Sequence, residues 1–175
     1  MKMLIGLLLA TCVPSGNATS ELRRRCNVGD TVVEGFRMNP AVGLTQSAAS
    51  REAAADPHRA LLASLGAYQG ATLIREYVLA NGGFGRQYAS DLPLDQAPTA
   101  VTMFYADKLL ALGWQMLGEP DAAVSCYAKG RQAVWILRAG PTDPGPPSEA
   151  RSAVEIAAPP AGAKFFFAVE AGPKP

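Results

Sequence analysis

The spacing of apolar side chains changes partway along the chain from a strand period to a helix period. Residues 72–79 follow a period of two, and Asn81-Gly82-Gly83 comes directly after them. A period of two indicates a strand, and Asn and Gly tolerate the positive φ angles that tight hairpin turns need. The pattern therefore predicts a β-hairpin whose return strand covers residues 84–89.

A helical spacing follows over residues 96–112. Asp95 suits the N-cap, Pro98 falls in the first turn, where a missing N–H costs little, and Gly113 suits the left-handed residue after a helix. We expect this segment to be the main helix. Apolar residues at three- and four-residue steps predict its buried face: Val101, Phe104, Tyr105, Leu109 and Leu112.

Shorter elements are predicted on both sides of this helix. Asp56-Pro57 is a typical helix start, and Gly66 is expected to end the short helix that follows. Four further strands are predicted from apolar runs bounded by turn residues, as a hairpin and a final pair: residues 123–128 with 132–137, and residues 153–157 with 164–169.

These elements predict the fold class. Because most connections are short, neighbouring antiparallel strands are favoured. The prediction is an α+β two-layer sandwich, with one main helix on an antiparallel sheet of five or six strands in the order ββαββββ. We expect the helix to pack on Ile74, Val78, Trp135 and one phenylalanine from residues 165–167.

The N-terminus has the pattern of an export signal. Lys2 precedes an apolar run over residues 3–13 that is too short to span a bilayer, and Gly16-Asn17-Ala18 offers small residues for cleavage after Ala18. The predicted organisation is a signal peptide over residues 1–18, a tether or poorly structured segment over residues 19–55, a single α+β domain over residues 56–171 and a tail over residues 172–175.

Leu9-Ala10-Thr11-Cys12 supports a second interpretation of the same segment. It resembles the lipobox of bacterial lipoproteins, in which the cysteine is lipid-modified and begins the mature chain. The resemblance implies that Cys12 is a lipidation candidate, whereas cleavage after Ala18 would remove it. Both alternatives stay open, and both predict an exported protein that is periplasmic or lipid-anchored to the cell envelope.

Composition narrows the classes of function. Sixteen Lys and Arg against fifteen Asp and Glu give a net charge of +1, which argues against nucleic-acid binding and against a polybasic membrane-surface protein. The only histidine, His58, lies in the first turn of the short helix, where a solvent-facing or capping role is expected. Because no spacing indicates a catalytic or metal site, we expect no enzyme activity, no cofactor and no metal.

Three short motifs lie between residues 65 and 140. They are Ala67-Tyr68-Gln69-Gly70-Ala71, Ser90-Asp91, and a helix pattern from Val101 through Phe104-Tyr105 and Leu109 to Gly113-Trp114. Together they resemble a group of uncharacterised bacterial exported proteins and lipoproteins with a Tyr-Pro-Gly-Ala turn, a strand pair and a Gly-Trp exit from the helix. Gln69 stands where that group has proline. The resemblance implies export and the strand order, and it implies no reaction.

Two cysteines remain once Cys12 leaves with the leader or carries a lipid. Thiols in an oxidising compartment pair where geometry allows, which predicts a disulfide between Cys26 and Cys126. The alternative is a buried free Cys126 with Cys26 exposed.

The run Phe165-Phe166-Phe167 is a candidate patch for a partner or ligand. Side chains alternate along a strand, so at least one of the three should face outward or into a covering segment. Core packing is the alternative for each of them.

These features predict a non-catalytic exported envelope protein, with or without a lipid anchor, that binds or supports another envelope component. The expected partner is an envelope protein or lipid, with no nucleic acid, and the membrane is reached only through the lipid anchor. The alternative is a small-molecule or lipid carrier with a cleft between helix and sheet. An apolar cavity beside residues 165–167 would favour the carrier.

Overall fold

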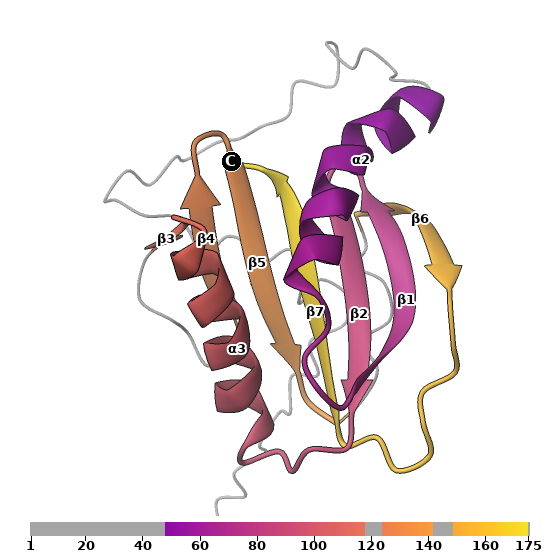
Figure 1. Cartoon of the computed structure of the whole chain (residues 1–175). Helices are drawn as coiled ribbons and strands as arrows, with labels where there is room; N and C mark the ends of the chain where they lie inside the picture. Colours follow the sequence, from indigo (N-terminus) through magenta and orange to yellow (C-terminus); the bar gives the residue numbers. More distant parts are fainter. Residues whose placement is uncertain (1–47, 118–123, 142–148, 175) are drawn as a thin grey trace, which may run out of the picture.

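A computed structural model describes residues 48–117, 124–141 and 149–174. Both helices in these ranges cover the same face of one sheet (Figure 1). In chain order the elements are α2 (Ala48–Leu65), β1 (Ala71–Leu79), β2 (Phe84–Ser90), α3 (Ala97–Ala111), β3 (Gln115–Leu117), β4 (Val124–Lys129), β5 (Gln132–Ala139), β6 (Ala150–Glu155) and β7 (Phe165–Pro173).

The strands of the described residues form one antiparallel sheet of seven strands, in the order β3-β4-β5-β7-β2-β1-β6. This confirms the α+β class, with more strands than the five or six predicted. Both predicted hairpins, β1–β2 and β4–β5, are confirmed.

The predicted pairing of the last two strands with each other is wrong. β7 lies between β5 and β2, whereas β6 lies on the outer side of β1. The side chains of the two strands explain this difference. β7 is buried from Phe165 to Gly172 and needs neighbours on both sides, while β6 is exposed from Arg151 to Glu155 and suits a sheet edge.

The main helix is confirmed as α3, with two corrections. Its N-cap is Gln96 rather than Asp95, and no side chain caps it. Leu112, predicted on the buried face, is 49% exposed because the chain turns away from the helix at Gly113, which has a φ of 77°. Of the predicted face, Val101, Tyr105 and Leu109 are buried.

The first described helix is longer than predicted. α2 begins at Ala48 rather than at Asp56, so Pro57 lies inside it and residues 48–55 are helical rather than part of a tether. Pro57 removes one backbone hydrogen bond, but the alanine-rich sequence before it has a high helix propensity. Residues 1–47, which include the predicted signal peptide, lie outside the described residues.

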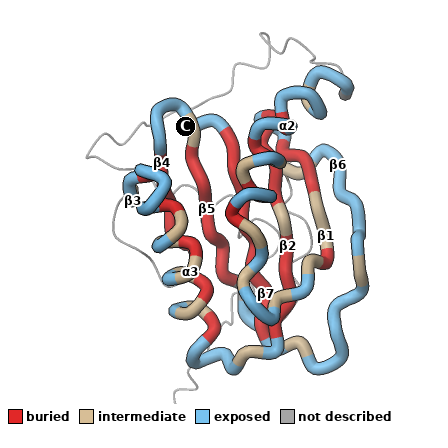
Figure 2. Tube along the Cα trace, viewed as in Figure 1, coloured by how far each residue is buried: buried red, intermediate tan, exposed pale blue. Residues whose placement is uncertain are grey.

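Consecutive positions along the central strands are buried (Figure 2), so apolar side chains are buried on both faces of the sheet. Val78, Val134 and Ile136 pack in the cluster beneath the helices. Ile74 and Trp135, which we expected beneath α3, belong to separate clusters on the opposite face. The correction follows from alternation: Val134 and Ile136 face the helices, so Trp135 between them must face away.

His58 lies on α2 and is buried rather than solvent-facing, at 8% exposure. Its Nδ1 atom has no hydrogen-bond partner among the described residues. Burial penalises the charged imidazolium and lowers the pKa of His58 below its ordinary value of 6.5.

We therefore expect acid to weaken the fold through His58. The unfolded chain takes up the proton first, so this contribution to stability is complete above pH 6.5 and is lost as the pH falls toward the folded pKa. Urea unfolding at about pH 7.5 and about pH 5.5 checks this, because His58→Gln should reduce the difference between the two free energies. An unchanged difference would contradict the assignment.

Candidate binding surface on α3

α3 exposes large apolar side chains as well as burying them. Its fifteen residues include only two charged side chains, Asp107 and Lys108. We define the α3 patch as four large exposed apolar residues on this helix and the edge strand after it, with their exposed fractions: Met103 59%, Leu110 50%, Leu112 49% and Met116 41%.

Two patch residues lie on the outer side of α3, and the other two lie at its C-terminal end and on the next strand. Met103 and Leu110 are seven residues apart, which places them about two turns apart on the same side of the helix. Leu112 caps the helix, and Met116 lies on β3, the edge strand that pairs with β4. Figure 2 shows exposed positions recurring along α3 and continuing into β3.

Side chains from α3 and β4 hold both helices in place. The Tyr105 hydroxyl donates to the carbonyl of Gly66, the residue after α2, at 3.2 Å. Lys108 Nζ donates to the carbonyl of Leu65, the last residue of α2. Lys129 Nζ donates to the Leu112 carbonyl at 2.7 Å. Cations at helix C-termini also complement the helix dipole. Burial raises the pKa of Tyr105 far above its usual range, which keeps this hydroxyl protonated as a donor.

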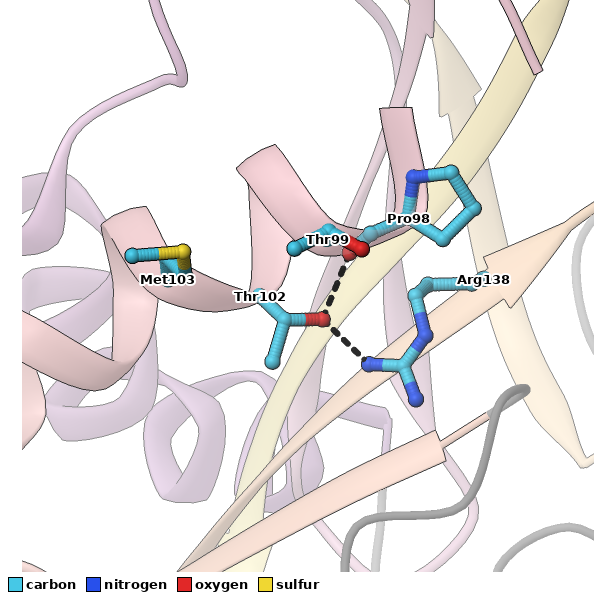
Figure 3. A pocket seen from close by; sticks show the side chains of 5 residues that line it. All are labelled: Pro98, Thr99, Thr102, Met103 and Arg138. Carbon is cyan, nitrogen blue, oxygen red and sulfur yellow. Dashed lines mark hydrogen bonds between the residues drawn. The ribbon is translucent and has the colours of Figure 1, made fainter. Parts of the chain in front are cut away.

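A pocket of about 310 Å³ opens at the N-terminal half of α3 (Figure 3). It is lined by Pro98, Thr99, Thr102 and Met103 of the helix and by Arg138 of β5. Met103 belongs to both the pocket and the α3 patch, so the two features are continuous.

Arg138 supplies the cationic group of this pocket. It is only 8% exposed, and its Nη1 donates to Thr102 Oγ1 at 2.7 Å and to Ser125 Oγ at 2.9 Å. Thr102 Oγ1 in turn donates to the Pro98 carbonyl at 2.7 Å. These bonds connect β5 to β4 and to the first turns of α3. The apolar side chains around Arg138 can contact a ligand or partner.

A second polar group lies on the sheet face opposite the helices. Tyr77 of β1 donates to Oε1 of Glu170 of β7 at 2.9 Å, and its ring crosses over Gly85 of β2. Arg75 donates to the Gln87 side chain at 3.0 Å. Glu170 is fully buried and Gln87 is 1% exposed. These side chains connect three adjacent strands, which is a structural role.

The three phenylalanines do not form an exposed patch. Phe165 and Phe167 are buried beneath the helices, where Phe167 stacks on Tyr88 with 5.0 Å between ring centroids. Phe166 packs with Ile74 on the other face and is 5% exposed. Because β7 is a central strand covered on both faces, the structure gives all three a packing role.

The cysteines are only partly described. Cys126 lies in β4 opposite Trp135, is 1% exposed and is disulfide-bonded. Cys12 and Cys26 lie outside the described residues. Lipidation of Cys12 and the pairing of Cys26 with Cys126 therefore stay predictions.

Sequence reasoning missed both the α3 patch and Arg138. The patch had a signal, because a helix with two charged residues in fifteen has too little polar surface for a free outer face. The sequence also contained a signal for Arg138, because this charged residue follows an apolar run in β5.

No family model, curated protein or solved structure matches the chain. Neither described helix is long and apolar enough to cross a membrane. The described residues also contain no group of three or more His, Cys, Asp or Glu side chains that could hold a metal ion.

Proposed function

We propose that the protein is a non-catalytic exported envelope protein that binds another envelope component through the α3 patch. The observation that carries this proposal is the exposure of four large apolar side chains, between 41% and 59%, along one helix and the adjoining edge strand. Large exposed apolar side chains gathered on neighbouring elements are typical of protein–protein interaction sites.

The position of α3 supports the same proposal. Bonds from Tyr105 and Lys108 to the end of α2, and from Lys129 to the end of α3, fix the helix before any partner arrives. A preorganised surface loses less conformational entropy on binding. The proposal includes export, which rests on the N-terminal sequence pattern. It also includes the two-layer arrangement, in which both described helices cover the same side of the sheet.

Capture from chemically cross-linked envelopes tests the proposal. We expect the full chain to capture a partner that the double variant Leu110→Lys/Met116→Lys loses, because two lysines in the contact would have to be desolvated. Leu94→Lys is the matched control, since Leu94 is 46% exposed but lies outside the patch. Equal capture by all three proteins would contradict a role for the α3 patch.

The pocket beneath α3 favours a second candidate function, a small-molecule carrier. Its volume of about 310 Å³ is at the lower end for ligand sites, and Arg138 places a cation against largely apolar walls. The apolar walls suit a small apolar ligand. Native mass spectrometry of the purified chain should then show a co-purifying ligand that Arg138→Met loses.

A further inference from the structure

β6 is an edge strand of the sheet that the described residues form. It pairs with β1 on one side and is the last strand of the described sheet on the other. Every side chain from Arg151 to Glu155 is exposed, whichever face of the sheet it occupies. The strand lies at the opposite end of the sheet from β3 and the α3 patch.

The backbone of β6 offers hydrogen-bonding groups outward at defined positions. The Ile156 N–H donates to the Ile74 carbonyl of β1 at 2.9 Å, so Val154 and Ser152 also direct their backbone groups toward β1. Ala153 and Glu155 therefore direct theirs away from the sheet. Before them, a register shift opposite Val78 and Leu79 interrupts the ladder at Arg151.

The sequence of β6 is self-complementary about Ala153. Arg151 lies two residues before Ala153 and Glu155 lies two residues after it. In an antiparallel pair of identical strands centred on Ala153, each Arg151 therefore faces Glu155 of the second copy. Among the described residues neither side chain has an ion pair within its own copy. Opposite charges directly across a strand pair stabilise the pairing.

The residues at the centre of such a pair are small enough for close approach. Ala153 would face its own counterpart, and Ser152 would face Val154 of the second copy. Val154, which is 60% exposed, and Ile156, which is 51% exposed, would gain apolar contact across the new pair. Charge, backbone direction and side-chain size thus agree on one register.

We propose that two copies of the chain associate through antiparallel pairing of their β6 strands about a twofold axis at Ala153. The backbone bonds form at the central Ala153 pair, and two Arg151–Glu155 ion pairs flank it. The sheet then continues from one copy to the other and leaves both α3 patches free. Because β6 is short, the interface is small, and we expect a dissociation constant on the order of 10–100 µM.

Sedimentation equilibrium of the full chain tests the proposal by charge reversal. Arg151→Glu alone and Glu155→Arg alone each place like charges opposite one another twice, and each should raise the dissociation constant about tenfold or more. The double variant Arg151→Glu/Glu155→Arg restores opposite charges and should return the constant to within about threefold of the original.

A backbone variant provides a second test. Ala153→Pro removes an N–H that points outward, so the ladder to β1 survives and the thermal unfolding curve should change little, while the dimer is lost. The α3 variant Leu110→Lys/Met116→Lys should dimerise like the original chain, which separates this surface from the one proposed above.

Three results would overturn the proposal. One is a chain that stays monomeric up to millimolar concentration, and another is a charge reversal that leaves the dissociation constant unchanged. The third is stronger association when Arg151 and Glu155 are both replaced by alanine, because the charges would then protect the edge from pairing.

Discussion

Replacing Gly85 with alanine is expected to lower the free energy of unfolding by about 3 kcal/mol or more. A Cβ atom at this position would lie 2.2 Å from Cε2 and 2.5 Å from Cζ of Tyr77, well inside van der Waals contact. The ring has little freedom to move, because Tyr77 is 2% exposed and its hydroxyl donates to the fully buried Glu170 at 2.9 Å. Relief of the clash would therefore weaken a buried hydrogen bond in the core.

Chemical denaturation of matched variants checks this expectation. Gly140→Ala is the control, since a Cβ there meets no atom within 4 Å and the residue has no positive φ. In a Tyr77→Ala background the ring is gone, so Gly85→Ala should cost much less than it does in the original chain. Equal effects at Gly85 and Gly140 would contradict the packing of Tyr77 over Gly85.

Loss of the disulfide is the second change expected to have a large effect. If Cys126 pairs with Cys26, the bond closes a loop of about a hundred residues, and its removal should cost up to about 4–5 kcal/mol in the chain-entropy model. Cys26→Ser tests the bond most cleanly, because Cys126 is also a core side chain at 1% exposure.

Cys12→Ser is the matched control for the disulfide. It should leave the unfolding free energy unchanged, because this cysteine is expected to leave with the leader or to carry a lipid. In the unfolded, unreduced mature protein, neither Cys26 nor Cys126 should react with a thiol reagent. A loss of stability in Cys12→Ser equal to that of Cys26→Ser would contradict the predicted pairing, and so would two reactive thiols in the mature chain.

Local patterns predicted the elements that depend on neighbouring residues. Asn81-Gly82-Gly83 fixes the turn between β1 and β2, and Gly113, at a φ of 77°, ends α3 as expected. Both signals depend on backbone conformations available mainly to Gly and Asn, so they are readable without knowledge of the rest of the chain.

Pairings between distant strands could not be read in the same way. β7 inserts between β5 and β2 because an all-buried strand needs neighbours on both sides, and β6 takes the edge that remains. The sequence shows which residues form these strands but not which strands they meet. The same limit explains Trp135, which was predicted under α3 and lies on the opposite face. Alternation shows which residues of a strand share a face, but it does not show which of the two faces the helices cover.

The candidate site was less predictable than the fold. The role of Arg138 in the pocket follows from its contact with Thr102 of α3, which lies 36 residues away in the sequence. The α3 patch depends on which side of the helix the sheet covers. Phe165, Phe166 and Phe167 drew attention as a run, yet a central strand buries all three.

Site-specific photo-crosslinking in living cells tests the central claim most directly. A photoreactive phenylalanine analogue at Leu110 or Met103 is expected to yield a discrete crosslinked product with one envelope component. The same analogue at Leu94, which is comparably exposed at 46% and outside the patch, should not yield that product. Identical products at Leu94 and Leu110, or none at any position of the α3 patch, would contradict a binding role for this surface.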